Sequence, residues 1–248
     1  MSSIELRDVT MQFPGAVPIL DGVSLTIEPG EIVGLVGPAA SGKSVLLKLL
    51  CGLLQPSAGH ITINGLPTHG IDEDALMSVR AQIGMLFQNN ALFDFLTVEE
   101  NVAFPLTRLG KLPPAEISAQ ARERLRSVGL AGSEHKFPNQ LSGGMRKRAA
   151  LARAVIARPP VVLYDEPTAG LDPVTTSKIY DLLRAEQQAS SATVIVVSSD
   201  VDALRRFAPR LLMLHRSRVV YDGPTDAVEQ EGGAVVRQFV RGDLEGPL

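Results

Sequence analysis

The 248-residue chain is long enough for one large core or for two modest domains. A hydrophobic content of 45%, a charged content of 21% and a net charge of −3 are typical of a globular protein and argue against a general nucleic-acid-binding surface. The single cysteine, Cys51, excludes an internal disulfide, and no apolar stretch is long enough to cross a membrane.

The first third of the chain predicts strands and one helix. Residues 4–27 and 59–68 alternate apolar and polar side chains, which is typical of antiparallel strands with one buried face. Between them, "EIVGLVG" (31–37) is an apolar strand, and "SVLLKLLCGLL" (44–54) is an apolar helical segment. Cys51 falls within that helical segment, so we expect a buried and unreactive thiol.

The middle of the chain is mainly helical. Residues 71–82 predict a helix, "IGMLFQ" (83–88) predicts a short strand, and 97–132 are largely helical. Within that last stretch, Pro113–Pro114 precede an amphipathic helix that stops near Gly129.

After Pro138, helices and strands alternate. This pattern indicates right-handed crossovers and a mostly parallel sheet. The expected helices are 143–158, 174–189 and 201–207, and the expected strands are 161–164, 193–198 and 210–214.

We therefore expect a single α/β domain over residues 1–248. Its β subdomain and core would comprise about 1–88 and 160–230, its helical subdomain about 89–158, and its C-terminal tail 231–248.

The segment "GPAASGKS" (37–44) fits the phosphate-loop pattern G-x-x-x-x-G-K-[ST], between a predicted strand and a predicted helix. Its glycines allow successive backbone N–H groups to point at phosphate oxygens, and the following helix adds its positive dipole end. The lysine would bridge the β- and γ-phosphates, and the last serine would hold Mg²⁺. The residues expected to bind the nucleoside triphosphate here are Gly37, Pro38, Ala40, Ser41, Gly42, Lys43, Ser44 and Val45.

A pair of carboxylates ends the predicted strand in "VVLYDEPTAGLDP" (161–173). Asp165 would orient Mg²⁺ through water, and Glu166 would polarise the attacking water. A solvated acidic turn is the alternative, but the phosphate loop supplies the partner that the catalytic interpretation requires.

The segment "LSGGM" (141–145) precedes the basic helix "RKRAALARAVIAR". Ser142 is suited to cap that helix, and Gly143 and Gly144 would let backbone N–H groups approach an anion. Alone this is a weak signal, because the basic helix would equally suit a solvated face or a nucleic-acid contact. Its order after the phosphate loop and before Asp165–Glu166 makes the combination specific.

These motifs together resemble the ABC-transporter ATPases over about residues 4–230. The resemblance implies a P-loop RecA-like core with a mostly parallel sheet, an antiparallel β subdomain and a helical insertion. It also implies ATP and Mg²⁺ as ligands. In that family the signature, here Ser142, Gly143 and Gly144, grips the γ-phosphate held by the opposite subunit, which implies a head-to-tail homodimer.

Further positions match the family one at a time. Gln88 resembles the loop glutamine that senses Mg²⁺ and the lytic water, and Phe13 resembles the aromatic residue that stacks on adenine, although it would equally suit the core. Asp172 resembles the aspartate that communicates across the dimer, and Glu166 resembles the catalytic base. Ser199, in "VVSSD", stands where the family usually has a histidine that contacts the γ-phosphate. Loss of one oriented donor costs on the order of 10²–10³ in rate, so we expect slow hydrolysis unless the contact comes from elsewhere.

Three segments resemble the ATPases of Mla- and Mce-type lipid transporters. The resemblance implies ATP-driven lipid or phospholipid transport, either maintaining outer-membrane lipid asymmetry or importing lipids. The implied partners are an integral membrane permease and a periplasmic Mce-domain lipid-binding protein, and a small regulatory subunit is considered as a further one. The segments are "LSGGMRKRAALARA", "LFQNNALFDFLTVEENVAFPL" and the less specific "VRQFVRGDLEGP".

The N-terminal residues lack the apolar region of a signal peptide. We therefore expect a cytoplasmic protein that lies peripherally on the cytoplasmic face of a bacterial inner membrane. No nucleic-acid partner is expected.

Four of the eight phenylalanines fall within Phe87–Leu106. They would form either a surface that receives a short permease helix or the core of the helical insertion. Further apolar surface is expected from Leu92, Leu96, Val98, Val102 and Leu106.

Three functions are alternatives to that of a transport ATPase. A P-loop kinase or GTPase has no use for "LSGGM". A non-transport ABC protein that acts on ribosomes or nucleic acid is the second class, and membrane co-purification would separate it from a transporter. A weakly active regulatory nucleotide-binding subunit is the third, because of Ser199, and an ATPase assay would separate it.

Overall fold

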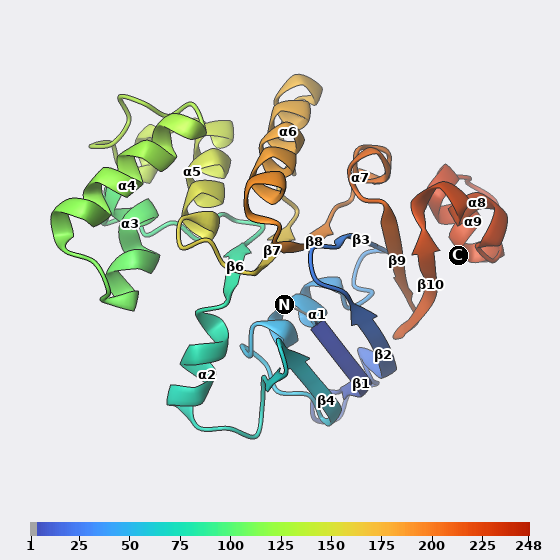
Figure 1. The fold of residues 1–248 in the computed structure, drawn as a ribbon. Helices are drawn as coiled ribbons and strands as arrows, with labels where there is room; N and C mark the ends of the chain where they lie inside the picture. Colours follow the sequence, from blue (N-terminus) through green and yellow to red (C-terminus); the bar gives the residue numbers. More distant parts are fainter. Residues whose placement is uncertain (1–3) are drawn as a thin grey trace. The chain divides into compact units, whose positions relative to one another are not determined.

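The computed structural model describes residues 4–248. The chain divides into two compact units (Figure 1). The first contains the described residues up to Arg80 together with Ser191–Leu248, and the second contains Ala81–Ser190. These limits differ from the subdomain limits expected from sequence, which stay a prediction.

The first unit contains an antiparallel sheet in the order β2-β1-β4-β5. Alternation of apolar residues in β1 (Ile4–Met11) and β2 (Leu20–Ile27) buries one face, as expected. In the register, Ile4 of β1 lies opposite Ile27 of β2 and Ile63 of β4 (Ala58–Ile63). The short β5 (Leu66–Pro67) pairs with β4.

The first unit also contains four further strands in the order β10-β9-β3-β8. The strand β3 (Ile32–Val36) lies between two parallel neighbours, β8 (Thr193–Val197) and β9 (Arg210–His215). All five residues of β8 are buried, as its continuous apolar sequence indicates. The antiparallel strand β10 (Arg218–Pro224) was not expected from sequence.

The helices of the first unit follow or flank these strands. Five are helical segments of four to eight residues: α1 (Lys43–Leu50), α2 (Glu73–Arg80), α7 (Val201–Phe207), α8 (Val228–Glu231) and α9 (Ala234–Arg241). The last two, together with a 3₁₀ turn at Thr225–Ala227, were not expected from sequence. Val236 and Val240 of α9 are buried, so this part of the expected C-terminal tail is packed.

The second unit contains two parallel strands, β6 (Ile83–Leu86) and β7 (Val161–Asp165), with four helices. The helices are α3 (Val98–Leu109), α4 (Pro114–Ser127), α5 (Gly143–Val155) and α6 (Pro173–Ser190), with a 3₁₀ turn at Pro138–Gln140 before α5. Figure 1 shows α3, α4 and α5 grouped together. The stretch expected to be largely helical, 97–132, is interrupted at Gly110, which has φ 63° and ends α3.

An apolar cluster joins α3, α4 and α5. Val98, Val102 and Leu106 are at most 7% exposed and belong to this cluster together with residues such as Leu125. The expectation that these α3 residues add apolar surface is therefore wrong. One face of α3 packs against α4 and α5, which removes its apolar side chains from solvent.

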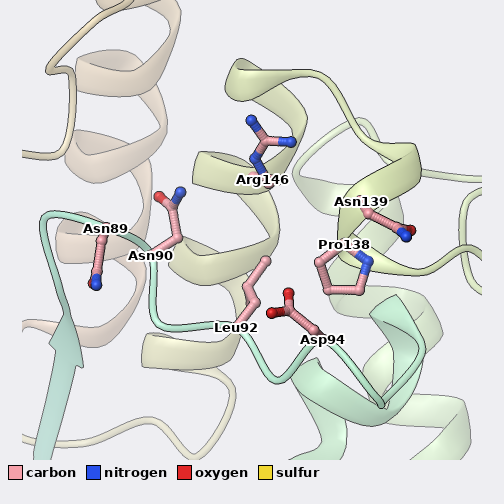
Figure 2. Close-up of a pocket in the computed structure, with 7 residues that line it drawn as sticks. All are labelled: Asn89, Asn90, Leu92, Asp94, Pro138, Asn139 and Arg146. Carbon is pink, nitrogen blue, oxygen red and sulfur yellow. The ribbon is translucent and has the colours of Figure 1, made fainter.

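A pocket of about 260 Å³ lies in the second unit (Figure 2). It is enclosed by the segment that follows β6, the 3₁₀ turn and the first part of α5. Its lining combines polar, charged and apolar side chains: Asn89, Asn90, Leu92, Asp94, Pro138, Asn139 and Arg146.

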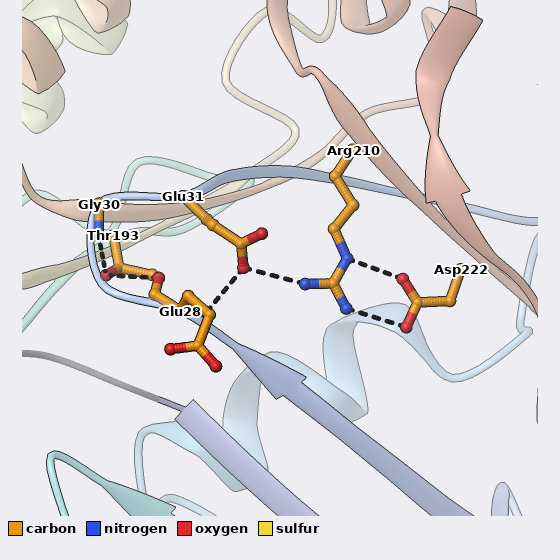
Figure 3. Close-up of polar contacts among 6 residues, drawn as sticks. All are labelled: Glu28, Gly30, Glu31, Thr193, Arg210 and Asp222. Carbon is orange, nitrogen blue, oxygen red and sulfur yellow. Dashed lines mark hydrogen bonds and ion pairs between the residues drawn. The ribbon is translucent and has the colours of Figure 1, made fainter. Parts of the chain in front are cut away.

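Within the first unit, a polar cluster secures the turn before β3 (Figure 3). Arg210 donates to both carboxylate oxygens of Asp222, at 2.7 and 2.9 Å, and to Glu31 at 2.9 Å. The hydrogen bond with Asp222 is the largest of the effects that raise the pKa of Arg210. The Gly30 N–H donates to the buried Thr193 hydroxyl at 3.0 Å. The start of β3 is thereby tied to β8, β9 and β10.

None of the helices in residues 4–248 is both long enough and apolar enough to span a bilayer.

Candidate functional site

The segment Gly37–Gly42 connects β3 to α1 by an unusual backbone path. Three residues of this loop have positive φ: Gly37 at 146°, Ala40 at 59° and Gly42 at 100°. An added Cβ at Gly37 would overlap the carbonyl oxygen of Leu214 at the end of β9. Loops with such positive-φ residues allow successive N–H groups to point at an anion, which is how phosphate is bound at sites of this type.

Lys43 folds back into this loop. Its Nζ donates to the carbonyl oxygens of Gly37 at 2.7 Å and Pro38 at 2.8 Å, and to the Ser41 hydroxyl at 3.4 Å. Ser44 and Val45 follow it in the first turn of α1, which contains no acidic residue. No carboxylate of α1 therefore neutralises the positive end of the helix dipole, which suits the binding of an anion.

Ser199 lies at the same sheet edge as the phosphate loop. In the parallel register, Leu35 of β3 is opposite Val197 of β8. Gly37 and Ser199 each lie two residues beyond this pair, at the carboxyl ends of the two strands. Ser199 is exposed at this edge. The carboxyl ends of neighbouring parallel strands are where α/β proteins bind ligands.

The neighbours of Ser199 have structural tasks. Ser198 is 2% exposed, and its Oγ accepts from the Asp200 N–H at 3.1 Å. Asp200 caps α7 by accepting from the Ala203 N–H at 2.9 Å. Of the two serines in "SSD", Ser199 is the exposed one.

Phe13, the candidate adenine-stacking residue, is 42% exposed. Its carbonyl accepts from the Ala16 N–H at 3.0 Å in the turn between β1 and β2. The alternative that Phe13 belongs to the core is therefore wrong. Its stacking role stays a prediction.

In the second unit, the strand register brings Gln88 and Glu166 to one edge. Leu86 of β6 is opposite Tyr164 of β7, so Gln88 and Glu166 each lie two residues beyond a paired position. Asp165 is the last residue of β7 and is 7% exposed. Glu166 follows it with φ 50°, a left-handed conformation that costs about 1–3 kcal/mol for a residue other than glycine.

The signature segment begins α5. Ser142 is the N-cap, and its Oγ accepts from the Met145 N–H at 3.3 Å, as expected. Ser142 and Gly143 are exposed, and a Cβ added at Gly143 would contact nothing within 4 Å. Met145 packs against the apolar cluster of the second unit.

The cations of α5 bind to main-chain carbonyls of their own unit. Lys147 Nζ donates to the carbonyls of Gln88 at 2.7 Å and Glu166 at 3.0 Å. The sequence left open a solvated basic face or a nucleic-acid contact for this helix. Neither interpretation fits side chains that donate hydrogen bonds to carbonyls of their own unit. Three arginines act similarly: Arg146 on Leu141, Arg148 on Val128 and Gly129, and Arg153 on Asn90 and Ala91.

The composition of α5 is the sequence feature that could have indicated these internal contacts. Lys147 and Arg153 lie on a helix whose other residues are largely apolar or small, and both are less than 10% exposed. Burial lowers the pKa of each, whereas the charges of Glu166 and Asp165 act to raise that of Lys147.

Asp172 caps α6. Its carboxylate accepts from the Thr175 N–H at 2.9 Å and from the Thr175 hydroxyl at 2.6 Å. The bond from the Thr175 hydroxyl, followed by that from its backbone N–H, lowers the pKa of Asp172. Asp172 therefore has a structural task within the chain, and its role between copies stays a prediction.

The phenylalanine-rich segment divides into inner and outer members. Phe93 packs on Phe104, with ring centroids 4.8 Å apart, and lies under the Arg153 guanidinium. Phe95 is 77% exposed. The buried Asn101 side chain fixes the loop that contains Phe95 through hydrogen bonds to main-chain atoms of Phe93, Leu96 and Thr97. Phe95 is consequently presented to solvent from a fixed loop.

Within residues 4–248, no group of three or more His, Cys, Asp or Glu side chains could hold a metal ion. The candidate Mg²⁺ residues supply a hydroxyl and an amide or carboxylate oxygen: Ser44 from the first unit, and Gln88 and Asp165 from the second. Oxygen donors suit Mg²⁺, which is usually held by one or two protein groups together with substrate phosphates. The residues therefore fit a metal that arrives with a nucleotide.

Comparison with known proteins identifies the family. The family model described as "ABC transporter" matches residues 20–169. The chain is 40% identical over 261 residues to the chloroplastic protein TRIGALACTOSYLDIACYLGLYCEROL 3 of Arabidopsis thaliana, covering 99% of this chain and 75% of that protein.

Other relatives have other transport names. The probable ribonucleotide transport ATP-binding protein mkl of Mycobacterium tuberculosis is 41% identical, over 99% of this chain and 68% of its own length. The methionine import ATP-binding protein MetN of Caulobacter vibrioides is 38% identical, over 99% and 74%.

A solved structure matches both fold and sequence. The ATP-binding cassette MJ0796, in a dimeric post-hydrolysis state with ADP and phosphate, has a TM-score of 0.83 and 34% identity, covering 90% of this chain and 98% of that one. The expected α/β cassette fold is confirmed, and so is the assignment of the chain as an ATP-binding ATPase. The chain belongs to the ABC transporter family, as an ATP-hydrolysing cassette.

Proposed function

We propose that the chain is the ATPase of a lipid transporter of the Mla or Mce type, in which two copies bind two ATP molecules head to tail. The accessible start of α5 at Ser142 carries the dimer proposal. A helix N-terminus with an exposed serine cap and an exposed glycine suits a phosphate held by another molecule. Each copy has one phosphate loop and one signature, so a two-fold axis creates two equal sites.

In this proposal, the phosphate loop and Lys43 bind the triphosphate and Phe13 stacks on adenine. Glu166 accepts a proton from the attacking water, and the Gln88 side chain orients that water. Support comes from the strand register, which puts Gln88 and Glu166 at the same edge of the second unit. Ser44, Gln88 and Asp165 would each offer an oxygen ligand to Mg²⁺, which would neutralise charge on the phosphates.

The catalytic proposal is tested with Glu166→Gln, which keeps the shape of the side chain and removes the base. We expect ATP binding within about twofold of the wild type and a fall in hydrolysis of about 10²–10⁴-fold, which is the usual contribution of a general base. ATP trapped on this variant should crosslink pairs through cysteines introduced at Ser142 and Ser41. Monomers, or pairs joined through another surface, would contradict the head-to-tail arrangement.

The lipid assignment rests on the resemblance of the signature and Phe87–Leu106 segments and on the relative whose name contains a galactolipid. Ribonucleotide or methionine transport is the second candidate, because mkl and MetN match at similar identity. Under the lipid proposal, the chain lies on the cytoplasmic face of the inner membrane. Its partners are an integral membrane permease and a periplasmic Mce-domain protein.

We propose that the permease docks a short helix on Phe95 and the adjacent pocket (Figure 2). An exposed aromatic side chain beside a pocket containing Asp94 and Arg146 suits a helix with one apolar anchor and a polar flank. Phe95→Ser should lower the amount of permease that co-purifies, with Leu66→Ser as the control. Leu66 is 41% exposed in β5, outside this segment. Equal co-purification of the two variants would count against this docking surface.

The transported compound is tested on the complex purified from membranes. Mass spectrometry should detect a Mce-domain protein and enriched phospholipid, and phospholipid vesicles should stimulate ATP turnover. Stimulation by methionine or a ribonucleotide instead would favour the second candidate. Co-purification with ribosomes or nucleic acid in place of a permease would contradict both.

A further inference from the structure

A single buried side chain connects three parts of the second unit. Lys147, 5% exposed, lies on α5 one turn after the signature. Its Nζ donates to the Gln88 carbonyl at 2.7 Å and to the Glu166 carbonyl at 3.0 Å. The segments that follow β6 and β7 are therefore held to the same ammonium group.

Burial of the Lys147 ammonium has a desolvation cost that an apolar side chain at this position would not have. An ammonium is strongly hydrated, and its transfer into the interior is unfavourable unless hydrogen bonds replace the lost water. Charge-assisted bonds to two carbonyls offset that cost. An apolar side chain of similar length would fill the same space without it, so fixing the two carbonyls is the property that distinguishes lysine here.

The backbone that Lys147 holds is in an unfavourable conformation. Glu166 has φ 50°, and such conformations persist only where surrounding contacts determine them. The Glu166 carbonyl accepts from Lys147 Nζ and from the Ala169 N–H at 3.3 Å. Asn90 and Ala91, which follow Gln88, also have positive φ, and Arg153 holds both of their carbonyls.

We propose that Lys147 is a positioning residue for ATP hydrolysis. Its ammonium fixes the main chain at Gln88 and Glu166, so that both side chains face one water molecule. Because Lys147 and the Ser142 cap share α5, a displacement of the signature also displaces both of these residues. This inference rests on the catalytic roles proposed for Gln88 and Glu166.

The test compares three variants of the full chain. Lys147→Met removes the donors and keeps an unbranched side chain, and Lys147→Arg keeps the charge and the donors. Arg148→Met is the matched control, because Arg148 lies on the same helix and its Nη1 donates to the carbonyls of Val128 and Gly129, both at 2.9 Å. Neither of those residues is a candidate for catalysis. If Lys147→Met does not fold, Lys147→Gln replaces it.

ATP turnover with γ-labelled ATP separates kcat from KM, and a fluorescent ATP analogue gives Kd. For Lys147→Met we expect kcat to fall by at least about tenfold, because small displacements of catalytic groups have effects of this size. KM and Kd should stay within about twofold of the wild-type values, since the phosphate loop keeps all its contacts. Lys147→Arg should recover most of kcat. Arg148→Met should lower Tm without lowering kcat.

Three results would overturn the inference: a Lys147→Met kcat within twofold of the wild type, an equal loss of kcat in Arg148→Met, or a rise in KM without a fall in kcat. Glu166→Gln in the same assay separates this inference from the proposal beneath it. If Glu166→Gln is inactive and Lys147→Met is active, only the positioning role fails. If Glu166→Gln hydrolyses ATP at the wild-type rate, the catalytic proposal fails and the positioning role fails with it.

Discussion

Replacement of Gly37 by alanine tests the conformation of the phosphate loop. Gly37 has φ 146°, where side chains are disfavoured, and an added Cβ would overlap the Leu214 carbonyl oxygen and approach Ser41 Oγ at 2.8 Å. The backbone conformation costs about 1–3 kcal/mol, and the overlap costs about 1–3 kcal/mol more.

Movement of the loop would relieve this strain, and ATP binding would have to restore it. The lower end of the combined cost, about 2 kcal/mol, corresponds to a Kd for ATP about 30-fold weaker than in the wild type. Titration of the full chain with a fluorescent ATP analogue measures Kd, and circular dichroism measures Tm.

Gly65→Ala is the control for backbone strain alone. Gly65 has φ 76° in the turn between β4 and β5, and its added Cβ would meet nothing within 4 Å. This variant should lose about 1–2 kcal/mol of stability and keep the wild-type Kd. If Gly37→Ala bound ATP within twofold of the wild type, the reasoning about this loop would be refuted.

Four further predictions concern Ser199, Thr97, Glu100 and Cys51. Ser199→His should raise the kcat of ATP hydrolysis by at least about tenfold, since it restores one oriented donor; a slower variant in the turnover assay would reject the idea that Ser199 limits the rate. Thr97→Ala should lower the free energy of unfolding by about 1 kcal/mol in urea titrations, because Thr97 is the N-cap of α3. Hydrogen bonds from the Thr97 backbone N–H and hydroxyl lower the pKa of Glu100 below its ordinary 4.5. The stabilisation by the ionised Glu100 carboxylate is therefore fully present above pH 4.5, and it is lost as the pH falls through the lower pKa of the folded state. The destabilisation by Glu100→Gln should accordingly be measurable at pH 7 and shrink below pH 4.5, and a loss that is the same at both pH values would contradict this account. Burial raises the pKa of Cys51 to about 12, so the folded chain should not react with a thiol reagent at pH 8, and reaction should appear only in denaturant.

The sequence by itself determined the features that depend on neighbouring residues. The phosphate loop between β3 and α1 is contiguous, and its glycines and lysine define it without distant contacts. The Ser142 cap, the proline start of α4 and Asp165 at the end of β7 are local in the same sense. Strand and helix periodicity likewise predicted most elements. The short elements β10, α8 and α9 were not predicted, although Val236 and Val240 of α9 are buried at helical spacing.

Only the tertiary structure decided which of these features lie side by side. Ser199 is adjacent to the phosphate loop because β8 pairs with β3, although about 160 residues separate them in sequence. Val98 and Val102 are core because their face of α3 packs against α4 and α5. Helical periodicity identifies this apolar face but cannot say whether it packs within the chain or against a partner. The same limit applies to Lys147. Its sequence neighbours suggest a basic helix, whereas its two carbonyl partners lie in the segments that follow β6 and β7, 59 and 19 residues away.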